Sequence, residues 1–195
     1  MLADLINNRS RIHTRDIRMA TWPHEGGQVI VSGELHDTRY IPVFDITGQV
    51  REPGTIHHIR LFCLVAPDPL RIVAAEADML TIPMGECRTT LDRVPLLEGL
   101  EIKPGFTRKV AEIMGGTRGC THLCTLTKAM AQEMVHGWFT EKRRNPTPLP
   151  DSIEDIKESG FLVDSCRMWK QDGPKIQALA QAIQQASRDS KKQAK

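Results

Sequence analysis

The sequence is poor in aromatic residues and has no long hydrophobic run. Aromatic residues make up 5% of the 195 residues, with a single tyrosine. No window approaches the roughly 18 continuous apolar residues of a membrane-spanning helix. The formal net charge is only +2, so the chain lacks the strong positive field of a nucleic-acid-binding domain. We therefore expect neither a membrane nor a nucleic acid as a partner, and instead a small-molecule substrate or a partner enzyme.

Signals for secretion and for disulfide bonding are also missing. The N-terminus has no basic segment followed by an apolar stretch of about 7–15 residues, so no signal peptide is visible. The five cysteines are an odd number, and the chain is too long for a cysteine-stapled mini-protein. We therefore expect a cytoplasmic protein whose cysteines are reduced.

Several motifs of common enzyme classes are absent as well. The chain has no dinucleotide-binding Gly-x-Gly-x-x-Gly, no Walker loop, no Gly-x-Ser-x-Gly and no His-Glu-x-x-His. It also has no Cys-x-x-Cys pair, so any metal site would draw its ligands from separated segments.

The first half of the chain shows the alternation of apolar and polar residues that predicts β-strands. Turn residues separate these segments, which favours an antiparallel sheet with one buried face. The predicted strands are Ile12–Met19, Gln28–Leu35, Ile56–Val65 and Leu70–Ala77.

The second half shows helical spacing of its apolar residues. The predicted helices are Thr89–Leu97, Pro104–Met114, Cys120–Phe139, Ser152–Glu158 and Lys175–Ala186. Together the two halves predict an α+β fold, with an N-terminal antiparallel β-sheet packed against C-terminal helices. We expect a single domain over residues 1–186, β-rich over 12–82 and α-rich over 88–186, with an exposed loop at 141–150 and a flexible basic tail at 187–195.

The most informative motif is the segment Gly115–Leu123, in which two glycine-containing turns lead to Cys120 at the start of the strongest predicted helix. Unpaired backbone N–H groups and the positive end of the helix dipole stabilise a thiolate there. His122 follows two residues later. Residues at that spacing do not face each other in a regular helix, but the first residues of a helix start need not be helical, so the pair can reach one ion. The same glycine-rich turn also suits an anion such as a phosphate-bearing ligand.

Two further cysteines lie at expected element starts, in Pro83–Cys87 and in Asp164–Cys166. Three such thiols and one imidazole match the ligands of a four-coordinate zinc or iron site. That candidate metal set is Cys87, Cys120, His122 and Cys166. The other two cysteines, Cys63 and Cys124, lie on apolar faces and are predicted to be core residues.

The sequence resembles a bacterial family, the domain of unknown function numbered 2889. The resemblance covers roughly Ile12–Ile183 and is carried by Val31–Thr38, Ile56–Leu61, Ile72–Ala77 with the following Cys87, Gly115–Leu123 and Asp164–Cys166. It implies that seven residues occupy family-typical positions: Asp37, His57, Cys87, Cys120, His122, Asp164 and Cys166. Members of the family often occur among catabolic genes for aromatic compounds and acyl thioesters. The layout is also similar, more weakly, to the U-type iron–sulfur scaffold fold.

Three functions stay open from the sequence. The first is a zinc or iron protein, with the role of a catabolic enzyme among its options, in which Asp37 or Asp164 orients a ligand or moves protons. The second is a metal-free enzyme in which Cys120 attacks an acyl substrate and His122 activates the thiol. The third is a non-catalytic iron–sulfur or sulfur carrier, or an accessory protein to a catabolic enzyme.

Overall fold

The structure, a computed structural model, describes residues 1–146, 148–158 and 162–193, with the backbone alone for residues 157–158 and 189–193. It divides into two compact units, Met1–Lys142 and Arg143–Lys195, and each is described by itself. The single domain over residues 1–186 stays a prediction. Residue 147 of the predicted loop and residues 194 and 195 of the predicted tail lie outside the described residues.

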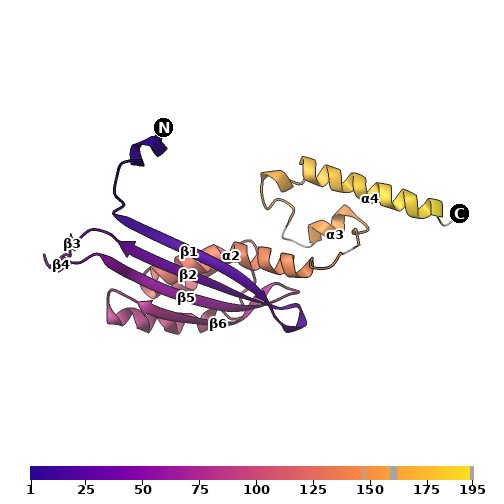
Figure 1. Ribbon diagram of the computed structural model, residues 1–195. Helices are drawn as coiled ribbons and strands as arrows, with labels where there is room; N and C mark the ends of the chain where they lie inside the picture. Colours follow the sequence, from indigo (N-terminus) through magenta and orange to yellow (C-terminus); the bar gives the residue numbers. More distant parts are fainter. Residues whose placement is uncertain (147, 159–161, 194–195) are drawn as a thin grey trace. The chain divides into compact units, whose positions relative to one another are not determined.

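A four-stranded antiparallel sheet forms the centre of the first unit, in the order β1-β2-β5-β6 (Figure 1). Its strands are β1 (His13–Pro23), β2 (Val29–Arg39), β5 (Gly54–Ala66) and β6 (Arg71–Thr81). All four predicted strands are confirmed, and each is longer than the alternation indicated. Short 3₁₀ helices, η1 (Leu2–Ile6) and η2 (Glu25–Gly27), precede and follow β1.

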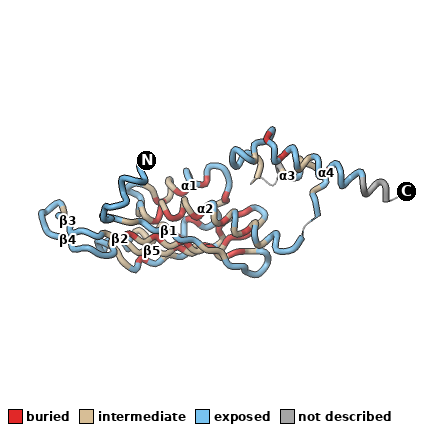
Figure 2. The backbone as a smooth tube through the Cα atoms, turned by 45° about the horizontal axis from the view of Figure 1, so that its top comes forward, coloured by how far each residue is buried: buried red, intermediate tan, exposed pale blue. Residues whose placement is uncertain are grey.

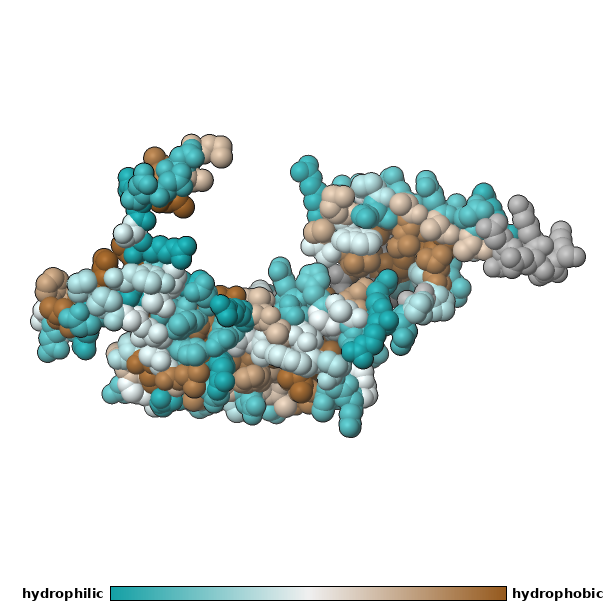
Figure 3. All heavy atoms as spheres, viewed as in Figure 1, coloured by the Kyte–Doolittle hydropathy of each residue, from teal (hydrophilic) through white to brown (hydrophobic). Residues whose placement is uncertain are grey.

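A small hairpin connects β2 to β5 and consists of β3 (Val43–Phe44) and β4 (Val50–Arg51). Asp45 holds its turn, because its carboxylate accepts hydrogen bonds from the backbone N–H groups of Thr47 and Gln49. Apolar side chains of this hairpin, including Phe44 and Ile46, are exposed (Figure 3). The hairpin is therefore an ordered extension between the two central strands of the sheet.

Helices cover one face of the sheet in the first unit. They are η3 (Gly85–Arg93), η4 (Pro95–Leu97), α1 (Phe106–Met114), η5 (Gly116–Arg118) and α2 (Thr121–Lys142). The buried residues gather between the sheet and α2 (Figure 2). This arrangement confirms the α+β class with an N-terminal antiparallel sheet and C-terminal helices.

The segment Thr89–Leu97, predicted as a short helix interrupted near Pro95, is helical and forms the two 3₁₀ helices η3 and η4, with the second starting at Pro95. Two threonine hydroxyls there donate to nearby carbonyls, from Thr89 to Glu86 and from Thr90 to Cys87. Such side-chain bonds compete with regular helix bonds, and Pro95 has no N–H to continue an α-helix.

Small residues let α2 approach the sheet closely. A Cβ atom on Gly33 of β2 would lie 2.5 Å from the Sδ atom of Met130. A Cβ atom on Gly137 of α2 would lie 2.1 Å from the hydroxyl oxygen of Thr21 on β1. Both distances are below van der Waals contact. Any larger residue at Gly33 or Gly137 would therefore push α2 away from the sheet.

The second unit contains α3 (Ile153–Glu158), η6 (Arg167–Trp169) and α4 (Pro174–Gln193). Ile176 and Ile183 are buried along α4 at helical spacing. This helix passes its predicted end at Ala186, because residues 187–193 include neither glycine nor proline. Of the helices in the described part of the chain, none is long and apolar enough to cross a membrane.

Candidate functional site

Strand pairing brings three polar side chains to neighbouring positions on three strands. Asp37 of β2 lies opposite Arg15 of β1 and opposite His57 of β5. Asp37 is only 1% exposed, because it continues the alternation that buries Val31 and Leu35 on the helix-covered face. The register between β2 and β5 shifts directly after the pair Asp37 and His57. The three side chains therefore meet at the end of the regular ladder.

Asp37 is held by both neighbours. Arg15 donates from Nε to Oδ1 and from Nη2 to Oδ2 of Asp37, each over 2.7 Å. His57 donates from Nδ1 to Oδ2 of Asp37 over 3.0 Å. Burial opposes ionisation of this carboxyl, but the hydrogen bonds and charge of Arg15, aided by His57, outweigh it and lower the pKa of Asp37. The carboxylate is therefore ionised, and Nε2 of neutral His57 is left as a hydrogen-bond acceptor.

The start of α2 adds a thiol and a second imidazole. Cys120 directly precedes Thr121, the first residue of α2, and its carbonyl accepts a hydrogen bond from the N–H of Cys124. Nδ1 of His122 lies 3.9 Å from Sγ of Cys120, and Nε2 of His122 lies 3.7 Å from Oδ2 of Asp37. The ring of His122 therefore lies between a thiol and a buried carboxylate.

The two imidazoles lie against each other. The ring centroids of His57 and His122 are 3.7 Å apart, and the ring planes are tilted by 30°. Burial lowers the pKa of both histidines, and the positive charge of Arg15 adds to this effect. Both rings are therefore neutral at neutral pH, which is the form that can accept a proton.

These lowered pKa values predict that acid destabilises the fold. Below about pH 6.5 the unfolded chain protonates its histidines, whereas folded His57 and His122 resist protonation. The free energy of unfolding should therefore decrease as the pH falls from about 6.5 through the folded pKa values. Urea midpoints at pH 7.5 and pH 5.5 measure this loss. It should be smaller in the double variant His57→Asn/His122→Asn, and an equal loss in both proteins would contradict the assignment.

Asp37, His57 and His122 also form a possible metal-binding group. Their ligand-type atoms all lie within 4.8 Å of one another, and among the described residues this is the one such group of three or more. Cys87 lies in η3 and does not belong to this group. Of the predicted metal set, the structure brings together Cys120 and His122.

The other predicted site residues lie in the second unit. Cys166 is exposed and precedes η6. Asp164 accepts a hydrogen bond from the backbone N–H of Gln171 through Oδ1, over 2.9 Å. The metal set of Cys87, Cys120, His122 and Cys166, and the catalytic role of Asp164, stay predictions.

The remaining two cysteines are core residues, as predicted. Cys63 is 0% exposed on β5, and Cys124 is buried on α2. Burial raises the pKa of the Cys63 thiol to about 12, so this thiol stays protonated and unreactive. Cys120 is only half-buried, which leaves it open to a reagent.

Sequence reasoning missed Arg15 entirely. It expected only one of the neighbours His57 and His58 to face inward, and the family resemblance added a family-typical position for His57. Arg15 and His57 belong to the site because the register of strand pairing places them opposite Asp37. The alternation within one strand shows which side chains share a face, but not which residue of the next strand lies opposite. A signal was present in the predicted first hairpin, which carries Arg15 on one strand and has Asp37 just beyond the other. Opposite charges that pair across strands stabilise an antiparallel ladder, so this pair could have been found by aligning the hairpin.

Comparison with known proteins places the chain in a family. The family described as "Protein of unknown function (DUF2889)" matches residues 13–136, which is more than half of the chain. The chain belongs to this family. The DUF2889 match includes every residue of the site just described: Arg15, Asp37, His57, Cys120 and His122.

The DUF2889 match confirms the family that the sequence resembles, but it ends before the second unit. Asp164 and Cys166 lie beyond it, so their family-typical positions stay predictions. Neither the curated proteins nor the solved structures contain a match to this chain.

Proposed function

We propose that this DUF2889 protein is a thiol-dependent acyl-transfer enzyme with Cys120 as its nucleophile. The observation that carries the proposal is the position of His122 between Sγ of Cys120, at 3.9 Å, and Oδ2 of Asp37, at 3.7 Å. A nucleophile, a base and a group that orients the base are the parts that covalent acyl transfer needs. The probe substrate is an acyl thioester, whose carbonyl carbon accepts a thiolate.

The first half-reaction follows from these contacts. Nδ1 of His122 takes the thiol proton while Sγ of Cys120 bonds to the carbonyl carbon. The carbon–sulfur bond to the leaving group then breaks, and the leaving thiolate takes the proton back from His122. The acyl group is now bonded to Cys120, and no oxidant or reductant is needed.

Asp37 and Arg15 support the base in this step. A carboxylate beside Nε2 of His122 favours the tautomer with its acceptor at Nδ1 and stabilises the imidazolium that forms. The distance of 3.7 Å exceeds a hydrogen bond, and catalytic hydrogen bonds are often long before substrate binds. Arg15 holds the carboxylate through both oxygens, so the orientation of Asp37 is set in advance.

A cavity lies beside the start of α2, although neither Cys120 nor His122 is among its lining residues. It has a volume of about 290 Å³ and lies against Thr121, the residue after Cys120. Its other lining residues include Gly115, Arg118 and Lys128. Backbone N–H groups in the first turn of α2 have no partner within the helix, and such donors stabilise the oxyanion of acyl transfer.

Trapping the acyl group tests this proposal. The protein is mixed with the acetyl thioester of N-acetylcysteamine, quenched in acid, digested and analysed by mass spectrometry. We expect acetyl on the Cys120 peptide, loss of that adduct in Cys120→Ser, and retention of it in the matched controls Cys87→Ser and Cys166→Ser. The absence of both an adduct and thiol release, or equal labelling of Cys87, Cys120 and Cys166, would contradict the proposal.

Metal binding is the second candidate, and the closeness of Asp37, His57 and His122 favours it. Zinc or iron suits imidazole and carboxylate ligands. Two contacts weigh against it in this arrangement. Arg15 donates to both oxygens of Asp37, and the rings of His57 and His122 lie against each other, 3.7 Å between centroids, with no space for an ion between the ring faces.

Elemental analysis of freshly purified protein separates the two candidates. One zinc or iron per chain, lost in His57→Asn, would favour the metal. Protein free of both metals that still acetylates Cys120 would favour the thiol enzyme. The same assay on Cys87→Ser and Cys166→Ser tests the metal set predicted from the sequence.

A further inference from the structure

His57 is the second imidazole of the site, and the first half-reaction leaves it without a role. Its Nδ1 donates to Oδ2 of Asp37 over 3.0 Å, a shorter contact than the 3.7 Å between Asp37 and His122. Its ring lies against that of His122, with 3.7 Å between the ring centroids. The side chain is 14% exposed, so the ring is held in place and still reaches solvent.

The hydrogen bond to Asp37 determines which nitrogen of His57 can act. Because Nδ1 carries the proton, Nε2 of the neutral ring has a free lone pair. An imidazole whose Nδ1–H is fixed by a buried carboxylate is the usual form of a general base. His57 meets this description more closely than His122, which has the longer contact to Asp37 and faces the thiol.

An acyl-enzyme has a second proton to remove. To release the acyl group, a water molecule must bond to the carbonyl carbon and lose a proton, while the bond to Sγ of Cys120 breaks. Nδ1 of His122 faces the sulfur itself, which is the leaving atom of this step. The two imidazoles beside Asp37 can therefore have different roles: His122 exchanges a proton with the thiol, and His57 accepts a proton from the water.

Resting on the function proposed above, we propose that His57 is the general base of the second half-reaction and that the acyl acceptor is water. Nε2 of His57 takes a proton from the attacking water, and that proton ends on the departing thiolate of Cys120, which regenerates neutral His57. The products are a free carboxylic acid and the regenerated thiol. The enzyme is then an acyl-thioester hydrolase with separate bases for its two steps.

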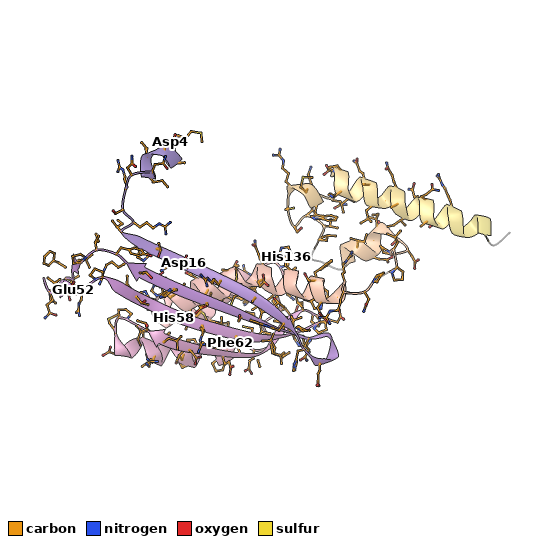
Figure 4. The ribbon with its side chains drawn as sticks, viewed as in Figure 1. Asp4, Asp16, Glu52, His58, Phe62 and His136 are labelled. Atoms are coloured by element: carbon orange, nitrogen blue, oxygen red, sulfur yellow. The ribbon has the colours of Figure 1, made fainter. Side chains whose placement is uncertain are left out.

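The decisive variant is His57→Asn. The side-chain amide of asparagine keeps a donor toward Asp37 but has no nitrogen lone pair that accepts a proton, so it removes the base and retains the hydrogen bond. The matched control is His58→Asn. His58 is the next residue of β5 and lies on the opposite face of the sheet, in one row with Asp16, and bonds to Glu34 (Figure 4).

The experiment follows thiol release and acyl-enzyme together, with the acetyl thioester of N-acetylcysteamine in excess. In the wild type we expect released thiol well beyond one equivalent per chain. In His57→Asn we expect a burst near one equivalent, acetyl accumulating on Cys120 and a turnover lower by about 10²–10⁴-fold. Hydroxylamine attacks the acetyl–Cys120 thioester without needing a base, so it should restore repeated release of thiol from the substrate in this variant. His58→Asn should behave as the wild type.

Two results would overturn this inference. One is a turnover rate in His57→Asn equal to that of the wild type. The other is a folded His57→Asn protein without a burst, in which acylation of Cys120 is as slow as turnover, because the defect would then lie in the first half-reaction. If His57→Asn does not fold by circular dichroism, His57→Gln replaces it with the same expectations. A wild type that never acylates Cys120 contradicts the proposed function itself, so the two failures are distinguishable.

Discussion

Replacing Asp37 with asparagine is expected to slow the acylation of Cys120 by about 10³–10⁴-fold, because both histidines lose the carboxylate that sets their tautomers. The amide of asparagine presents one oxygen and one donor, whereas Arg15 and His57 both need an acceptor. Stopped-flow release of thiol from the acyl thioester measures the rate.

The same substitution should also destabilise the fold. We expect a loss of about 2–3 kcal/mol in urea unfolding at pH 7, because hydrogen bonds between charged groups are lost. The loss stays below that of a fully buried pair because Arg15 is 38% exposed and can be hydrated. Asp16→Asn is the matched control, since Asp16 is the next residue to Arg15 on β1 but lies on the other face. If the Asp37→Asn variant has the same free energy of unfolding and the same rate of Cys120 acylation as the wild type, the account is contradicted.

Replacing His122 with asparagine removes the base that faces the thiol. We expect acylation of Cys120 at pH 7 to fall by about 10²–10⁴-fold, the usual contribution of a positioned base. The deficit should shrink in alkaline solution, where cysteine thiols ionise without help. Burst kinetics over pH 6–10 measure both effects.

The control for this variant comes from the same helix. His136→Asn changes an exposed imidazole of α2 that lies outside the site (Figure 4). It should leave the burst rate unchanged. If His122→Asn acylates Cys120 within about twofold of the wild type at pH 7, the base is not His122.

The fold was predictable where local pattern and burial agree. Apolar alternation in β2 and helical spacing along α2 each match the face that the structure buries. The pattern did not show that the segment of η3 and η4 is 3₁₀ helix, where threonine hydroxyls donate hydrogen bonds to backbone carbonyls and Pro95 follows. It also ended α4 too early, because charged residues that look like a tail are equally compatible with a helix.

The site was only partly predictable for a physical reason. Cys120 and His122 are close in sequence, so the turn before α2 sufficed to place them together. Arg15 and His57 reach Asp37 across strands, and a slip of one residue in register would turn each to the opposite face. Residue spacing within one segment does not show such a pairing, and only an alignment of the two strands in register would have revealed Arg15 opposite Asp37.

In the proposed mechanism, Asp37 orients His122 and His122 activates Cys120. The most direct test is to measure the rate at which iodoacetamide alkylates each cysteine at pH 7, by peptide mass spectrometry. The account predicts that Cys120 reacts faster than the other accessible thiols, Cys87 and Cys166, and that His122→Asn removes this advantage. The buried thiols of Cys63 and Cys124 should stay unlabelled in the folded protein. Equal Cys120 rates in the wild type and in His122→Asn would contradict the account.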